Sequence, residues 1–231
     1  ETCELKVKKY RNAADAFIIE GARSAEEVLE SGWYILHAFV DVTIDSARIR
    51  TISDKLEAGG VTVFEVTPEV MNRLSDTDSP QGILVVVRKK TCELNDFNQN
   101  HEGLLLVLDE VRDPGNLGTM IRTADAAGID GIILLDGCTD VFAPKAVRSA
   151  MGSLFHLPIR NEQNKNEFIS WCRENNWSLW SSSLEGGKSI YGEELADRTA
   201  IVIGNEAEGV SSELLSASEK RVYIPMPGKA E

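Results

Sequence analysis

A single stretch, residues 104–137, carries the clearest fold signal: LLLVLDEVRDPGNLGTMIRTADAAGIDGIILLDG. The continuous apolar run at 104–111 is typical of a strand that is covered on both faces. Asp-Pro-Gly then turns the chain, and an amphipathic helix is predicted over 116–128 with Asn116 as its N-cap. A second apolar run follows at 131–137. A strand, a helix and a strand at this spacing predict a mostly parallel sheet with helices on its faces.

The same alternation continues to the end of the chain. Helices are predicted between further apolar runs, so residues 103–231 form one α/β domain with a mostly parallel sheet. The predicted strands are 177–183, 199–205 and 221–226, and the predicted helices are 144–151 and 164–175.

The first part of the chain reads as a second, smaller α/β domain over residues 1–90. Ser24 is predicted to cap a helix, with Glu27 completing a capping box. Residues 91–102 are polar without a sustained apolar period, which indicates a linker. The predicted strands are 17–21, 33–40, 61–66 and 82–90, and the predicted helices are 25–31, 45–58 and 68–74.

Composition sets the class of protein. The chain has 231 residues, of which 42% are hydrophobic and 26% charged, as expected for a globular protein of two domains. No apolar run approaches the length of a membrane span, and no signal-peptide pattern opens the sequence. The four cysteines are scattered without metal-ligand spacing, which favours reduced thiols in the cytoplasm. A net charge of −13 argues against binding nucleic acid through bulk charge.

Three segments carry candidate chemistry, and each follows a predicted strand. The first segment contains the helix predicted over 116–128. Free backbone N–H groups at the start of this helix favour an anion, and Arg122 adds a forked donor suited to phosphate. The simpler interpretation of this segment alone is an ordinary turn and cap, with Arg122 in a salt bridge.

The second segment places acidic residues between Gly204 and Gly209. Glycines there allow close approach of backbone to a ligand beyond the strand, and the acids suit a cationic or hydroxyl-bearing ligand better than a pyrophosphate. In the third segment, Pro225 and Pro227 bracket Met226 and force the chain out of regular pairing. An extended apolar segment of this kind is suited to binding a ligand that contains a flat ring. Plain surface loops remain the alternative for both segments.

Other well-known motifs are absent or wrongly spaced. EGGKS at 185–189 lacks the first glycine of a Walker A loop, since Ser182 occupies that position. No GxGxxG, HExxH or GxSxG pattern occurs in the sequence.

Taken in order, the three segments resemble the three motifs of the SpoU (TrmH-like) RNA ribose methyltransferases of the SPOUT superfamily. The matching stretches are NLGTMIRTADAAG at 116–128, IGNEAEG at 203–209 and IPMPG at 224–228. The domain before them looks like the L30e-like substrate-binding domain of that family, with KKYR at 8–11 preceding FIIEG. In the family the third motif continues into a Ser-Leu-Asn run and a final helix threaded through a trefoil knot, whereas this sequence ends at Glu231.

The resemblance implies transfer of a methyl group from S-adenosylmethionine to a ribose 2′-hydroxyl of tRNA or rRNA. It assigns catalysis to Asn116, Arg122 and Glu206. It assigns cofactor binding to Ser182, Leu184, Gly204, Ile224 and Met226. No metal is implied. We interpret Arg122 as a positioning group rather than a base, because an arginine guanidinium is rarely neutral in a resting site.

The resemblance also implies a homodimer, since two subunits of the family build each site. In an acidic protein, RNA contact must come from local basic groups. The predicted contacts are Lys6, Lys8, Lys9, Arg11, Arg112, Arg148 and Arg122 itself. Two alternatives stay open: a catalytically inactive L30e/SPOUT-type RNA-binding module, and a SPOUT enzyme that modifies a base.

Overall fold

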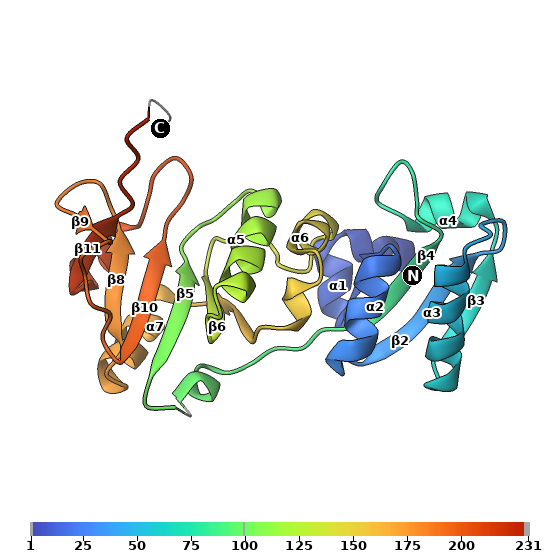
Figure 1. Ribbon diagram of the computed structural model, residues 1–231, viewed down its shortest axis with the longest axis horizontal. Coiled ribbons are helices and arrows are strands. Elements are labelled where there is room, and N and C mark those ends of the chain that lie inside the picture. Colours follow the sequence, from blue (N-terminus) through green and yellow to red (C-terminus); the bar gives the residue numbers. More distant parts are fainter. Residues whose placement is uncertain (1, 99, 229–231) are drawn as a thin grey trace. The chain divides into compact units, whose positions relative to one another are not determined.

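The computed structural model describes residues 2–98 and 100–228 of the chain. It contains two compact units (Figure 1). The first unit comprises Glu1–Lys90, Pro114–Arg122 and Asp140–His156. The second unit comprises Thr91–Asp113, Thr123–Thr139 and Leu157–Glu231.

The first unit is built on a mixed four-stranded sheet. Its strands lie in the order β1 (Ala16–Glu20), β4 (Ile83–Arg88), β2 (Ile35–Asp41) and β3 (Thr62–Val66). β4 pairs antiparallel with both of its neighbours, and β2 pairs parallel with β3. The four predicted strands are therefore confirmed, each within two residues.

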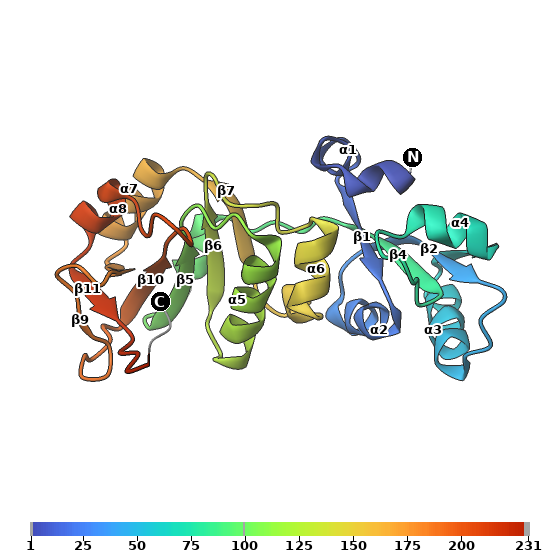
Figure 2. The ribbon, with the colours of Figure 1, turned by 90° about the horizontal axis from the view of Figure 1, so that it is seen from above.

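Helices cover both faces of this sheet (Figure 2). One face packs against α2 (Ala22–Ser31) and α3 (Ala47–Ala58), and the other against η1 (Thr2–Lys6) and α4 (Pro68–Leu74). α1 (Lys8–Ala14) follows η1. Successive side chains of a strand point to opposite faces of the sheet. Apolar residues of β1 and β4 therefore pack against the helices on both faces. The layer toward η1 and α4 contains Leu5, Ala16, Ile18, Met71, Leu74, Leu84 and Val86.

The predicted capping box at Ser24 is wrong. Helix α2 begins at Ala22 and its N-cap is Gly21, which makes no side-chain cap. Gly21 has a φ of 91°, a conformation that glycine adopts without steric cost, so the chain turns into the helix earlier than predicted. Ser24 consequently lies inside the first turn.

The second unit contains a seven-stranded sheet in which every pairing is parallel. The mostly parallel sheet predicted from the alternation is confirmed. In spatial order the strands are β7 (Ile159–Gln163), β6 (Gly131–Leu135), β5 (Gly103–Leu108), β10 (Arg198–Ile203), β8 (Ser178–Ser182), β11 (Lys220–Tyr223) and β9 (Lys188–Ser189).

Two helices lie on one face of this sheet, α7 (Lys165–Glu174) and α8 (Ser212–Ala217) (Figure 2). α7 is almost the helix predicted over 164–175. The side chain of Asn164 caps it by accepting hydrogen bonds from the backbone N–H groups of Asn166 and Glu167. Buried residues of both helices pack on β5, β8 and β10 in one hydrophobic cluster.

The segment predicted as a linker belongs to the second unit and packs within it. It contains η2 (Leu94–Asn98), and a Cβ on Gly131 would lie 2.2 Å from a ring carbon of Phe97. Trp177 Nε1 donates to Asn98 Oδ1 at 3.0 Å. These contacts give residues 94–98 a fixed position despite their polar sequence.

Of two further helices, one contains the first motif and the other packs against it. α5 (Pro114–Ala126) begins two residues before the predicted cap, so the prediction that Asn116 is the N-cap is wrong. Proline suits the first helical position because its φ is already helical. α6 (Pro144–Ala150) packs closely on Gly118 of α5, where a Cβ would lie 2.4 Å from Ser149 Cβ. No helix in the described part of the chain has the length and apolar character needed to cross a membrane.

Candidate catalytic and cofactor site

The predicted motif segments leave the second unit's sheet at one edge. Because all seven strands are parallel, the carboxyl ends of β5, β10, β8 and β11 share that edge (Figure 1). From β5 the chain runs to β6 and β7 on one side, and then returns to β8 and β10 on the other. The edge beside β5 and β10 is therefore a topological switch point, the place where open parallel sheets bind ligands.

A cavity of about 640 Å³ lies elsewhere, beside Gly103, Asp130 and Asp197. These residues stand at or just before the amino ends of β5, β6 and β10. Ligands of parallel sheets bind at the opposite edge, so this cavity is not the candidate site.

The second motif closes on itself after β10. Asn205 N–H donates to Gly209 O at 2.9 Å, and Gly209 N–H donates to Asn205 O at 3.0 Å. A Cβ on Gly204 would lie 2.1 Å from the carbonyl carbon of Gly209, so only glycine fits there. Gly209 itself has a φ of 72°. Both glycines predicted to allow a close backbone approach are needed for the loop itself.

This loop holds the backbone that leads into α5. The Glu206 carboxylate accepts hydrogen bonds from Arg112 N–H at 3.3 Å and Asp113 N–H at 3.1 Å. Asn205 Nδ2 donates to the carbonyl of Glu110 at 2.8 Å. Glu206 therefore shapes the first motif through its backbone.

An ion network that the sequence did not indicate lies beneath the same segment. Asp109 is fully buried, and its Oδ2 accepts from Ser211 N–H at 2.7 Å. Lys165 Nζ lies 2.7 Å from Glu110 Oε1 and 2.9 Å from Asp109 Oδ1, the latter an ion-pair contact without hydrogen-bond geometry. Lys165 thus ties α7 to the end of β5.

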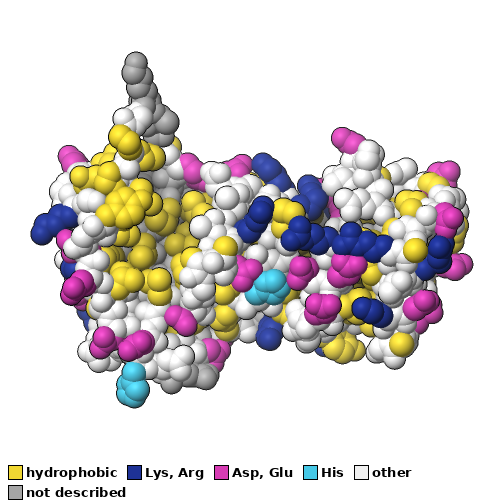
Figure 3. All heavy atoms as spheres, in the orientation of Figure 1, with side chains coloured by type: hydrophobic (Ala, Val, Ile, Leu, Met, Phe, Trp, Pro, Cys, Tyr) yellow, Lys and Arg dark blue, Asp and Glu magenta, His cyan; other side chains and the backbone are white. Residues whose placement is uncertain are grey.

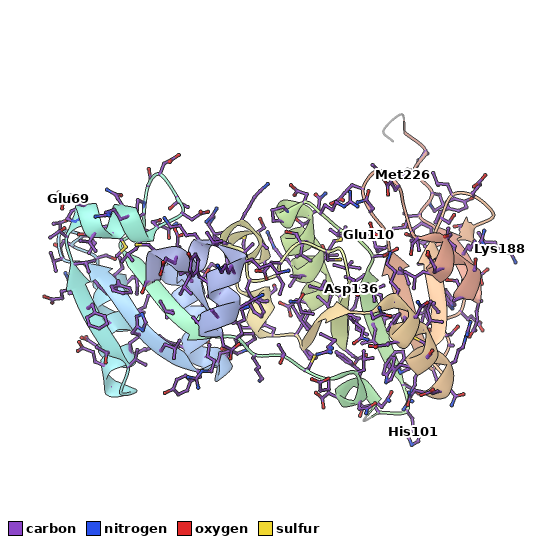
Figure 4. The ribbon with its side chains drawn as sticks, turned by 180° about the vertical axis from the view of Figure 1, so that it is seen from behind. Glu69, His101, Glu110, Asp136, Lys188 and Met226 are labelled. Carbon is purple, nitrogen blue, oxygen red and sulfur yellow. The ribbon has the colours of Figure 1, made fainter. Side chains whose placement is uncertain are left out.

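Glu110 is the strained point of this network (Figure 4). Its φ of 56° lies in the left-handed region, which is unfavourable for a glutamate. The hydrogen bond from Lys165 holds the pKa of the Glu110 carboxyl below its ordinary value, and Arg112 adds to the effect at 3.0 Å. Burial lowers the pKa of Lys165, but its contacts with Glu110 and Asp109 together outweigh burial, so the pKa is raised overall.

Helix α5 presents the other two predicted catalytic residues, Asn116 in its first turn and Arg122 further along; both are exposed. Arg122 Nη1 donates to the sulfur of Met151 at 3.3 Å. Met151 has a φ of 50° as the C-cap of α6. Asn116 and Arg122 belong to the first unit, and Glu206 to the second.

The predicted cofactor residues stand at the ends of three neighbouring strands. Ser182 ends β8, Gly204 follows β10 and Ile224 follows β11. Apolar side chains here are unusually open: Leu184 is 81%, Ile224 59% and Met226 62% exposed. Hydrophobic side chains gather over this part of the second unit (Figure 3). Exposed apolar side chains beside an extended, proline-bracketed backbone fit a flat adenine ring.

The predicted RNA contacts differ in their exposure and in their partners. Arg11 is withdrawn from the set, because it is 3% exposed and its guanidinium donates to the buried carboxylate of Asp140 at 2.5 Å. Lys6 Nζ donates to the backbone carbonyls of Arg73 and Ser75. Arg148 pairs with Asp76 at 2.9 Å, and Arg112 pairs with Glu110. Lys8 and Lys9 are exposed on α1.

Two family models match the chain. The SpoU rRNA Methylase family model matches residues 103–231, and the MRM3-like substrate binding domain model matches residues 1–85. Among curated proteins, the 23S rRNA (guanosine(2553)-2′-O)-methyltransferase RlmP of Bacillus subtilis is 33% identical over 99% of this chain and 87% of its own length. The mitochondrial rRNA methyltransferase 3 of Xenopus tropicalis is 32% identical over 96% of this chain and 51% of its own.

Solved structures resemble the whole chain as well. The AdoMet-bound rRNA methyltransferase from Sinorhizobium meliloti has a TM-score of 0.89 at 32% identity and covers 100% of this chain and 86% of its own. The SpoU methyltransferase AviRb from Streptomyces viridochromogenes, in complex with AdoMet, has a TM-score of 0.87 at 26% identity, with 100% and 89% covered.

Proposed function

Because this chain belongs to the SpoU rRNA Methylase family, we propose that it transfers a methyl group from S-adenosylmethionine to a ribose 2′-hydroxyl of rRNA or tRNA. The observation that carries the proposal is the convergence of the second and third motif segments, and of the backbone entering α5, at one edge of a parallel sheet. The similar AdoMet-bound structures support the choice of cofactor.

In this site the bound cofactor supplies an electrophilic sulfonium methyl group, and alignment with the attacking hydroxyl is the main demand. An arginine guanidinium is a forked donor and a poor base, so the role of Arg122 in this proposal is to hold an RNA oxygen. Asn116 offers an amide on the first turn of the same helix. Glu206 keeps α5 in place through the backbone of Arg112 and Asp113.

The cofactor would be held after β8, β10 and β11. The backbone at Gly204, Ile224 and Met226 would hydrogen-bond the adenosine, while Ser182 and Leu184 close the pocket from the next strand. The third motif is described as far as Gly228, and residues 229–231 lie outside the described residues. The predicted knot lies outside the described residues.

Residues 1–90 form the RNA substrate-binding domain in this proposal, residues 91–102 connect, and residues 103–231 form the methyltransferase domain. The match of residues 1–85 to a substrate binding domain model supports the first part. Lys8, Lys9, Arg112 and Arg148 remain candidates for phosphate contacts, with Lys6 beside them. We place the protein in the cytoplasm, because bacterial relatives act on ribosomal RNA.

A second copy of the chain is the proposed partner. The exposed apolar side chains of Leu184, Ile224 and Met226 support a homodimer as well as a cofactor site, since surfaces of this kind are seldom left to solvent. Light scattering across a dilution series measures the oligomeric state. A protein that stays monomeric at all concentrations contradicts the dimer.

The test of the proposed function is mapping of 2′-O-methyl groups in RNA from cells with and without the gene. One site that disappears with the gene identifies the target and decides between rRNA and tRNA. A protein that binds RNA but neither binds S-adenosylmethionine nor changes the methylation map would be the inactive binding module instead. A change confined to base methylation would indicate a base-modifying enzyme.

A further inference from the structure

Three segments of the first unit meet at one end of its sheet. Lys89, just after β4, donates from its backbone N–H to Asp15 O at 3.0 Å and from Nζ to Asn12 Oδ1 at 2.6 Å. Arg88 N–H donates to the carbonyl of Tyr34, just before β2, at 2.9 Å. The end of α1, the start of β2 and the end of β4 are therefore neighbours.

An aromatic ring stands in solvent at this point. Tyr34 is 63% exposed, and the Arg88 guanidinium lies 4.8 Å from its ring centroid. The hydrogen bond between their backbones holds Arg88 and Tyr34 next to each other. A single exposed aromatic residue is common on protein surfaces and by itself indicates nothing.

The charge around the ring gives it significance. Residues 8–15 and 88–90 carry Lys8, Lys9, Arg88, Lys89 and Lys90 against the single acid Asp15, once the buried Arg11 is paired with Asp140. Lys8 lies one helical turn before Asn12, the partner of Lys89, so both ends of the cluster share one surface. The whole chain has a net charge of −13, so this local excess of cations is the exception.

We propose that this surface, formed by Lys8, Lys9, Tyr34, Arg88, Lys89 and Lys90, binds a single-stranded segment of RNA. A base stacks on the Tyr34 ring beside the Arg88 guanidinium, and the lysines bind the phosphates on either side. Single strands are commonly bound by aromatic faces of this kind within a positive surface. An apolar protein interface would need neighbouring hydrophobic side chains, whereas the Arg88 guanidinium lies over this ring.

The proposal rests on the proposed function and adds to it a binding site for RNA on the first unit. The surface lies at the end of β4 opposite to Gly21, whose N–H donates to Ile83 O at the other end of that strand. Of its six residues, only Lys8 and Lys9 are among the RNA contacts that the sequence predicted.

Binding of a fluorescent single-stranded RNA by the purified protein tests the surface. Tyr34→Ala is expected to weaken binding about tenfold through loss of stacking, and Tyr34→Phe to keep it. Tyr191→Ala is the matched control, since Tyr191 is 76% exposed on the second unit. Lys90→Glu is expected to weaken binding and to make the salt dependence shallower, with Lys188→Glu as its control. Melting temperatures check that every variant folds.

Heparin, a polyanion without bases, separates stacking from charge. Its binding should fall with Lys90→Glu and stay unchanged with Tyr34→Ala. Equal loss of heparin and RNA binding in Tyr34→Ala would overturn base stacking. RNA binding at the parental level in both Tyr34→Ala and Lys90→Glu would overturn the surface, while methyl transfer by the parent would keep the proposed function. If the parent binds RNA through Tyr34 and transfers no methyl group, the surface stands and the proposed function fails.

Discussion

Lys165 is the cation that balances two carboxylates at the carboxyl end of β5. It is the counter-charge of the fully buried Asp109 and of the strained Glu110. Lys165→Met should lower the free energy of unfolding by about 3 kcal/mol, because it leaves a buried carboxylate without its partner. Lys165→Arg should restore part of the loss, and Lys188→Met, at an exposed lysine, should cost little. Urea unfolding measures all three, and a Lys165→Met variant as stable as the parent would contradict the network.

Glu110 gives the same network a pH signature. Its pKa is lowered in the folded protein, so its contribution to stability is fully present above its unfolded value of 4.5 and is lost as the pH falls through the lower folded value. The difference in unfolding free energy between the parent and Glu110→Gln should thus be constant near neutral pH and shrink below about pH 4.5. Urea titrations at several pH values follow it. A difference that grows toward acid pH would have the wrong sign.

Arg122 is the residue on which the catalytic assignment depends. Arg122→Ala should keep the fold, because the side chain is exposed. Methyl transfer should fall at least ~100-fold, about 2.7 kcal/mol of transition-state stabilisation. Arg122→Lys keeps the charge without the fork and should recover only part of the rate. Turnover of labelled S-adenosylmethionine measures the effect against Arg173→Ala as control, and near-parental turnover in Arg122→Ala would remove the assignment.

Among the elements, α1 is anchored by its one buried arginine. Arg11 donates to Asp140 and to the carbonyls of Leu5 and Lys6. Arg11→Met should lower the free energy of unfolding by about 3–5 kcal/mol, since it leaves Asp140 unpaired. The double variant with Asp140→Asn should lose less than the sum of the single variants. A strictly additive result from denaturant unfolding would mean that the pair does not couple.

Elements with a strong local signal could be predicted closely, and the others could not. α7 has an explicit cap in Asn164 and an amphipathic face, so its bounds came within a residue. β7 was missed because its sequence, IRNEQ, is mostly polar, as an edge strand can be. Asn116 and Ser24 were assigned to caps by residue type, whereas Pro114 and Gly21 decided the actual starts.

The candidate site shows the same division. The motif segments and their place after strands followed from short stretches of sequence. The part played by Lys165 could not be foreseen, because its contact with Glu110 joins residues 55 positions apart. Arg11 looked like one more surface cation in a basic run, and only the position of Asp140 shows why it is buried.

For the molecule as a whole, the acidity limits how RNA binds. With a net charge of −13, attraction must come from a few local cations, so few phosphates should be neutralised. The slope of log affinity against log salt should be shallow, roughly −2 to −4 for a single strand. Fluorescence anisotropy over a salt series measures it. A slope near −7, which corresponds to about ten contacts, would contradict local binding.

The tryptophans are distributed unevenly, and this has a spectroscopic consequence. Trp33 packs against Phe17 and Phe155 in the first unit, while Trp171, Trp177 and Trp180 lie in the core of the second. Intrinsic fluorescence therefore reports mainly on the second unit, and Trp33→Phe would make it a reporter of that unit alone. Following emission of this variant and far-ultraviolet circular dichroism together would reveal whether the two halves of the chain melt as one cooperative body or in succession.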